Sequence, residues 1–109
     1  MKPYSLGEFE ELVLLTVGVL YDEAYGVAIR EEIEQRFDRK VSVGAMQSAL
    51  RRMQDKGYLQ SRFGESTATR GGKRKRYFTI TAHGKRALLY TREMRDSLWK
   101  DIPDIAFDF

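Results

Sequence analysis

The chain contains no cysteine and a single histidine, His83, among its 109 residues. The absence of cysteine excludes disulfide bridges, a thiol nucleophile and any zinc or iron–sulfur site that needs thiolate ligands. One histidine excludes a metal site built from several imidazoles, and a Ser-His-Asp triad would depend on His83 alone. We expect His83 to be exposed on the first turn of the last helix. We expect no metal, no cofactor and no enzymatic activity, because neither a carboxylate pair nor an activated nucleophile stands out.

Long apolar runs are also missing. The longest, residues 12–21, is about half as long as a membrane-spanning helix of roughly 20 residues. Acidic rather than basic residues precede it, which argues against a signal peptide. We therefore interpret it as a core helix and expect a cytoplasmic protein with no membrane partner. The composition, 42% hydrophobic and 32% charged, is typical of one small globular domain.

Positive charge is concentrated in one part of the chain. Residues 39–86 hold 13 basic and two acidic residues, whereas the rest holds six basic and 14 acidic residues. The middle of the chain therefore carries +11 in a protein of net charge +3. A segregation of this size indicates an anionic partner, of which nucleic acid is the commonest. The alternative is a solvated basic face without a partner.

Hydrophobic periodicity predicts a fold that is mainly α with a small β-hairpin. Ser5 and Glu8 fit a capping box for the first helix, and Ser42 and Thr81 are candidate N-caps further on. Gly57 fits the residue that ends the third helix. The expected elements are helices over residues 6–20, 24–37 and 42–57, strands over 59–63 and 77–81, and a last helix over 82–100.

Three helices followed by a basic hairpin form the element order of a winged helix-turn-helix. The third helix has the features of a helix that reads the major groove, because small residues at its start allow close approach to DNA. Gln47 suits adenine and Arg51 suits guanine, while Arg52, Lys56 and the basic loop of the hairpin suit phosphates. The residues predicted to contact DNA are Ser42, Gly44, Ala45, Gln47, Ser48, Arg51, Arg52, Lys56, Arg70, Lys73, Arg74 and Lys75.

The last helix carries an apolar stripe that predicts a homodimer. Its apolar residues recur at coiled-coil-like spacing and cannot all be buried on so small a core, and an exposed stripe would be a liability in a monomer. We expect the first helix to complete the interface. Trp99 lies beside this stripe. The predicted interface residues are Phe9, Leu12, Val13, Leu88, Thr91, Met94, Leu98 and Trp99.

These patterns resemble the PadR family of bacterial transcriptional regulators over nearly the whole chain. The resemblance implies a winged-helix DNA-binding domain (1–81), a single C-terminal dimerisation helix (82–100) and, beyond it, an acidic, apolar tail (101–109). It also implies a homodimeric repressor that binds double-stranded DNA, and some members are released from DNA by small aromatic or cationic amphiphilic ligands. For such an aromatic or cationic small-molecule effector, Trp99 is the candidate contact. The stretches that carry the resemblance are LGEFEELVLL (6–15), AYGVAIREEIE (24–34), SVGAMQSALRRMQDKGYLQSRFGE (42–65) and RGGKRKRYFTITAHGKRAL (70–88).

One position departs from the family pattern. Gln47 stands where members commonly carry a tyrosine, so the role of that tyrosine is not carried over to this chain. We expect a sequence-specific regulator, a homodimeric repressor on an inverted-repeat operator. The alternative is an RNA-binding or protein-interaction winged-helix module without operator specificity. RNA readers usually expose stacking aromatic side chains on a sheet, and in the expected hairpin only Tyr77 lies on the face that could do so.

Overall fold

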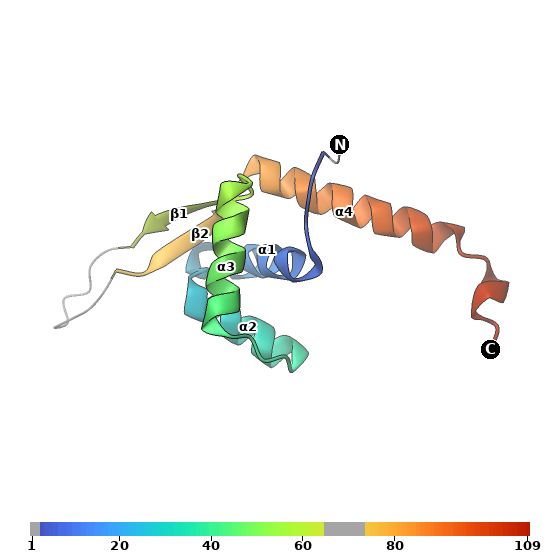
Figure 1. Ribbon diagram of the computed structural model, residues 1–109, viewed down its shortest axis with the longest axis horizontal. Coiled ribbons are helices and arrows are strands. Elements are labelled where there is room, and N and C mark those ends of the chain that lie inside the picture. Colours follow the sequence, from blue (N-terminus) through green and yellow to red (C-terminus); the bar gives the residue numbers. More distant parts are fainter. Residues whose placement is uncertain (1–2, 65–73) are drawn as a thin grey trace.

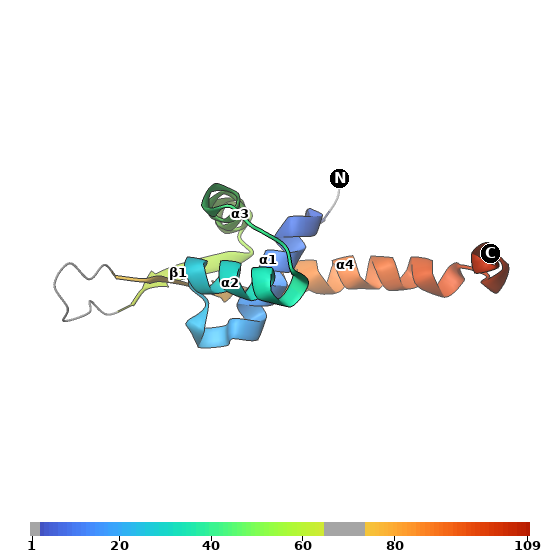
Figure 2. The same cartoon turned by 90° about the horizontal axis from the view of Figure 1, so that it is seen from below.

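The computed structural model describes residues 3–64 and 74–109. Three helices and the base of a β-hairpin form a body from which the hairpin extends at one end and the last helix at the other (Figures 1 and 2). This is the expected mainly α fold with a small hairpin. The elements are α1 (Glu8–Leu20), η1 (Tyr21–Glu23), α2 (Gly26–Phe37), α3 (Val43–Asp55), β1 (Leu59–Phe63), β2 (Arg76–Ile80), α4 (Ala82–Asp101) and η2 (Asp104–Phe107).

The body has one hydrophobic core. Because the apolar positions of α3 recur three and four residues apart, one side of this helix is buried and the opposite side is left to solvent. Burying a large apolar side chain stabilises the fold by roughly 1.5–3 kcal/mol, so these contacts hold α3 firmly against α1 and α2. The principal buried side chains are Val13, Leu14 and Val17 of α1, Ile29 and Ile33 of α2, Met46, Ala49, Leu50 and Met53 of α3, and Leu59 and Phe78 of the hairpin.

The hairpin is held to the body by backbone hydrogen bonds as well as by packing. β1 and β2 pair antiparallel, and the other edge of β2 meets the chain just before α2. The Phe78 amide donates to the Ala24 carbonyl at 2.8 Å, and Tyr25 forms an isolated bridge with Tyr77. Tyr25 is therefore extended and serves as the N-cap, so α2 begins at Gly26 rather than at the predicted residue 24.

The first helix begins later than predicted, at Glu8 with Gly7 as its N-cap. The predicted cap, Ser5, is wrong: it lies before the N-cap in the segment that leads into α1, where its amide donates to the Tyr58 hydroxyl at 3.0 Å. The acidic residue that reaches back to the start of the helix is Glu10, whose Oε1 accepts the Gly7 amide at 2.8 Å. This shift places Glu10, and not Glu8, beside the third helix.

The other predicted helix ends are confirmed. The Ser42 hydroxyl accepts the Ala45 amide at 3.0 Å at the start of α3. The Thr81 hydroxyl accepts the Gly84 amide at 2.9 Å at the start of α4. Gly57 follows α3 with a φ of 80°, a left-handed conformation that favours glycine.

His83 is half-buried, so the expectation of an exposed histidine is wrong. Its ring centroid lies 5.4 Å from that of Tyr4 and 5.0 Å from that of Tyr58. The segment before α1 passes over the first half of α4 (Figure 1), and the Tyr4 ring also lies 5.4 Å from that of Tyr90. Three aromatic rings therefore fix the point at which α4 leaves the body.

Most of α4 lies beyond the body. Its 20 residues span about 30 Å. Gly84 and Ala87 are buried near its start, whereas every residue from 92 to 101 is exposed. Although it is the longest helix described, neither it nor any other helix in the described ranges is long and apolar enough to cross a membrane.

Candidate nucleic-acid interface

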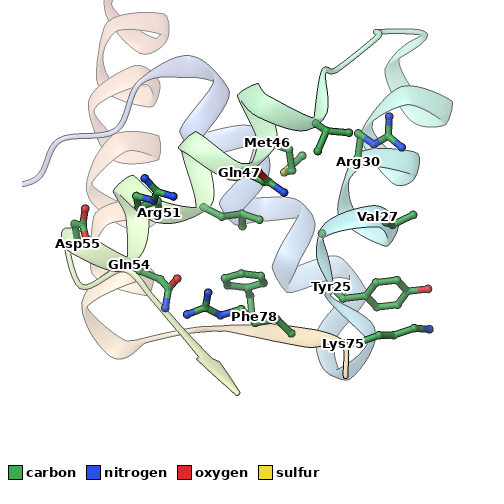
Figure 3. A pocket seen from close by; sticks show the side chains of 14 residues that line it. Tyr25, Val27, Arg30, Met46, Gln47, Arg51, Gln54, Asp55, Lys75 and Phe78 are labelled. Carbon is green, nitrogen blue, oxygen red and sulfur yellow. The ribbon is translucent and has the colours of Figure 1, made fainter. Parts of the chain in front are cut away.

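The solvent side of α3 carries the residues predicted to read DNA. Gly44, Ala45, Gln47, Ser48 and Arg51 are all exposed on this side. The first two turns are lined by small side chains, so the helix backbone is open to close approach. Gln47 and Arg51 project from the helix (Figure 3), and neither makes a hydrogen bond or ion pair with another described residue.

The third helix forms one wall of an open groove of about 680 Å³, with α2 and β2 as the other walls (Figure 3). The floor is apolar, because Met46, Leu50 and Phe78 lie beneath it and are at most 6% exposed. A cationic rim suits the phosphate backbone of a nucleic acid, which takes most protein–DNA hydrogen bonds. The cations that line the groove are Arg30 of α2, Arg51 of α3, and Lys75 and Arg76 of the hairpin.

Tyr25 and Lys75 meet at the hairpin end of this groove. The Lys75 ammonium lies 4.2 Å from the centroid of the Tyr25 ring. The same ring packs edge-on against Tyr77, with 5.7 Å between the centroids. Neither Tyr25 nor Arg30 was predicted from the sequence to lie at the interface. Their nearness to the third helix depends on the pairing of Tyr25 with β2, for which the sequence carries no local pattern.

Two cations predicted to contact phosphates are held by Glu10. Its carboxylate accepts Arg52 Nε at 3.1 Å and Lys56 Nζ at 3.0 and 3.1 Å. Glu10 is 6% exposed. Burial by itself would raise the pKa of Glu10, but the hydrogen bonds from the Gly7 amide, Lys56 and Arg52 outweigh burial and hold this pKa below its ordinary value. The carboxylate is therefore charged at neutral pH.

The basic loop of the hairpin is described only in part. Arg70 and Lys73 lie outside the described residues, so their predicted contacts with DNA stay predictions. Arg74 and Lys75 come directly before β2 and are exposed. Because Lys75 lines the same groove as Arg51, one end of the loop lies beside the third helix.

The predicted interface residues of α1 divide into buried and exposed sets. Val13 is 0% exposed, and its assignment to a dimer interface is wrong because this side of α1 packs into the core. Phe9 and Leu12 are half-buried. Leu15 and Val19, which were not predicted from the sequence, are 48% and 58% exposed and lie four residues apart on one side of the helix. The continuous apolar run of α1 has no periodicity that separates these sides.

The apolar stripe of α4 runs past the end of the body. Leu88 and Thr91 are half-buried, whereas Met94, Leu98 and Trp99 are 49%, 69% and 67% exposed. The first half of the stripe therefore packs on its own protomer. The second half lies in solvent, where the Trp99 ring contacts only Phe107 among the described aromatic residues of that protomer.

Trp99, the candidate effector contact, lies far along α4 from the groove. Its ring pairs with that of Phe107 in η2, with centroids 6.1 Å apart, and Trp99 does not line the groove beside α3. Among the described residues, no group of three or more histidine, aspartate or glutamate side chains is placed to hold a metal ion.

Comparisons with known proteins agree with this architecture. A sequence model of the transcriptional regulator PadR-like family matches residues 14–89. The fold is similar to a PadR-like transcription factor from Bacteroides fragilis, with 22% identity, a TM-score of 0.71 and 84% of each chain covered. It is also similar to a PadR family transcription regulator from Clostridium difficile, with 27% identity, a TM-score of 0.65 and coverage of 82% of this chain and 91% of that chain.

A PadR family transcriptional regulator from Eggerthella lenta is similar over 94% of this chain and 88% of that chain, with 22% identity and a TM-score of 0.68. A search of curated protein sequences found no match. The matched residues include α2, α3, the hairpin and the start of α4, which are the elements that form the cationic groove. The family model spans more than half of the chain and describes regulators of transcription, not enzymes, so this chain belongs to the PadR-like family of transcriptional regulators.

Proposed function

We propose that the protein is a homodimeric repressor that binds an inverted-repeat operator in double-stranded DNA. The observation that carries this proposal is the exposed side of α3, where small residues precede Gln47 and Arg51 beside a cationic groove. A helix with a small, polar surface can enter the major groove closely, and the adjoining cations can bind the flanking phosphates.

Specificity on this reading comes from three side chains of α3. Gln47 can pair with the edge of adenine, Arg51 with guanine, and the Ala45 methyl group can contact the methyl group of thymine. Arg51→Ala should cost about 1–3 kcal/mol on the operator and much less on scrambled DNA. Lys75→Ala is the matched control for a phosphate contact and should weaken binding to the operator and to scrambled DNA equally. Equal losses for Arg51→Ala would show that Arg51 does not read a base.

The partner proposed for the second half of α4 is another copy of this chain. Met94 and Leu98 continue a stripe that is half-buried nearer the body, and Leu15 and Val19 offer an apolar patch on α1. A two-fold dimer would bring two copies of α3 to half-sites about 10 bp apart, which is about 34–36 Å along the DNA.

Sedimentation tests the dimer. Leu98→Asp places a charge in the proposed interface, and we expect it to dissociate the dimer at micromolar concentration. Ser97→Asp adds the same charge at the adjacent exposed position and should leave the dimer intact. A wild-type monomer, or a dimeric Leu98→Asp variant, would refute this assembly.

The central experiment is an electrophoretic shift with duplex DNA from the region upstream of the gene. Scrambled duplex and RNA serve as competitors, because an RNA-binding module would prefer RNA and a protein-interaction module would bind neither. If the dimer contacts about 6–10 phosphates, raising the salt concentration from about 50 to 200 mM should weaken binding by roughly 10³–10⁵-fold. Repression is tested with a reporter that carries the same upstream region, whose expression should rise when the protein is removed.

Trp99 is the residue that we propose as the contact for a small-molecule effector. The observation that supports it is the exposed pair of rings formed by Trp99 and Phe107, to which Asp104 at the start of η2 adds negative charge. An aromatic cation could stack on this pair. Binding of such ligands should quench Trp99 fluorescence, and unquenched fluorescence across a panel of aromatic cations would argue against the site.

A further inference from the structure

Glu10 occupies an unusual position for a carboxylate. It lies on the first turn of α1, is 6% exposed, and faces the third helix across the body. Three groups donate to it: the Gly7 amide at 2.8 Å, Arg52 Nε at 3.1 Å and Lys56 Nζ at 3.0 Å. A buried carboxylate is tolerated only when it is paired in this way.

Both cations on Glu10 come from the helix that carries the proposed DNA-reading residues. Arg52 and Lys56 are four residues apart and so project from one side of α3. Ser48, on the exposed side, precedes Arg52 by four residues, so the Arg52 side chain begins close to the proposed DNA surface. Lys56 is held a second time, since its Nζ also donates to the Ser5 carbonyl at 2.9 Å.

These contacts change the charge that α3 offers to a partner. Arg51, Arg52 and Lys56 are the three cations of the helix and its cap. Arg52 and Lys56 are turned toward α1, where both pair with the single negative charge of Glu10, whereas Arg51 lies in the groove. When fewer cations of a helix are available to phosphates, the electrostatic part of its affinity for DNA, which does not depend on the base sequence, is smaller.

We propose that Glu10 is a positioning residue that withholds Arg52 and Lys56 from the DNA backbone. In doing so it fixes the rotation of α3 and increases the preference for the operator over other DNA. This inference rests on the proposed function. It reverses the role that the sequence alone suggests for Arg52 and Lys56. Because these two cations are held away from DNA, they add no affinity for arbitrary DNA.

The principal test compares Glu10→Gln with Glu11→Gln by fluorescence anisotropy on operator and scrambled duplexes over a range of salt concentrations. Both changes remove one negative charge from the same turn of α1. Glu11 pairs with Arg95 of α4 at 2.9 Å and makes no hydrogen bond or ion pair with α3 among the described residues, so it is the matched control. Glutamine keeps the shape of Glu10 and can still accept the Gly7 amide.

For Glu10→Gln we expect tighter binding to scrambled DNA and a smaller ratio of operator to scrambled affinity. The slope of log affinity against log salt concentration should steepen by about 0.9 for each cation released, and so by up to about 1.8 per protomer. Glu11→Gln should change neither the slope nor the ratio. Equal slopes for Glu10→Gln and the wild type would overturn the proposal.

Arg52→Gln tests the same idea without removing the buried carboxylate's other partners. If Arg52 is withheld from phosphates, this variant keeps the wild-type salt slope, and the double variant Glu10→Gln/Arg52→Gln loses part of the steepening. A slope that falls by about 0.9 per protomer in Arg52→Gln would show that Arg52 contacts phosphates and would refute the inference. Failure of the proposed function looks different, because the wild type itself would then not bind the operator.

Discussion

Gly84 should tolerate substitution poorly, because the start of α4 is pressed against the body there. A Cβ at Gly84 would overlap the Tyr58 carbonyl oxygen and lie 3.1 Å from Ile80 Cγ2. Neither neighbour moves cheaply, since the Tyr58 carbonyl accepts the Thr81 amide at 3.0 Å. Overpacking of this kind costs typically about 1–3 kcal/mol, whereas alanine in place of glycine returns at most about 1 kcal/mol of helix propensity.

We therefore expect Gly84→Ala to lower the free energy of unfolding by about 1–2 kcal/mol. For a chain of this size, each kcal/mol corresponds to a fall of roughly 4–8 °C in melting temperature. Urea and thermal unfolding, at one protomer concentration throughout, measure the change. Because α4 leaves the body at this turn, the variant should also bind an operator with altered half-site spacing relatively better than the wild type does.

Gly44→Ala is the matched control. Gly44 also lies in the first turn of a capped helix, but no atom lies within 4 Å of the Cβ that would be added. We expect its stability to stay equal to that of the wild type or to rise by up to about 1 kcal/mol. The packing argument fails if Gly84→Ala proves as stable as Gly44→Ala.

Three other changes test the fold. The pKa of Glu10 is lowered on folding, so its contribution to the free energy of unfolding is complete above the ordinary carboxyl pKa of about 4.3 and disappears as the pH falls through the lower folded value. Urea titrations from about pH 6 to about pH 3 should therefore show a larger loss for the wild type than for Glu10→Gln, and parallel curves would contradict this. Ser42→Ala removes the cap of α3 and should cost about 1 kcal/mol in urea unfolding, a loss that Ser42→Asn should largely restore. Phe78→Ala removes a side chain that is 6% exposed and should lower the free energy of unfolding by about 3–5 kcal/mol. Phe78→Leu should lower it clearly less, again measured by urea unfolding.

The elements of this protein are largely encoded by local pattern. The stripe of apolar residues in α3, the Ser42 and Thr81 caps and the left-handed Gly57 are short-range features, and each lies where the sequence predicts it. Charge segregation along the chain likewise indicates an anionic partner, because the charge of a segment depends on its composition and not on packing. The exposed side of α3 follows from the same pattern, since burial of one side of a helix leaves the opposite side to solvent.

Pairing between distant residues could not be deduced in this way. The bridge of Tyr25 to β2 delays the start of α2 and forms the groove, yet 52 positions separate Tyr25 from Tyr77. The carboxylate of Glu10 meets Arg52 and Lys56 across 42 and 46 positions, so two cations that look free in the sequence are already ion-paired. In the apolar run of α1, every side looks equally suited to the core, and only the docking of α2 and α3 decides that Val13 is enclosed while Leu15 and Val19 stay in solvent. These features arise because a side chain's partner is set by how the elements pack against one another, and no short-range pattern along the chain carries that information.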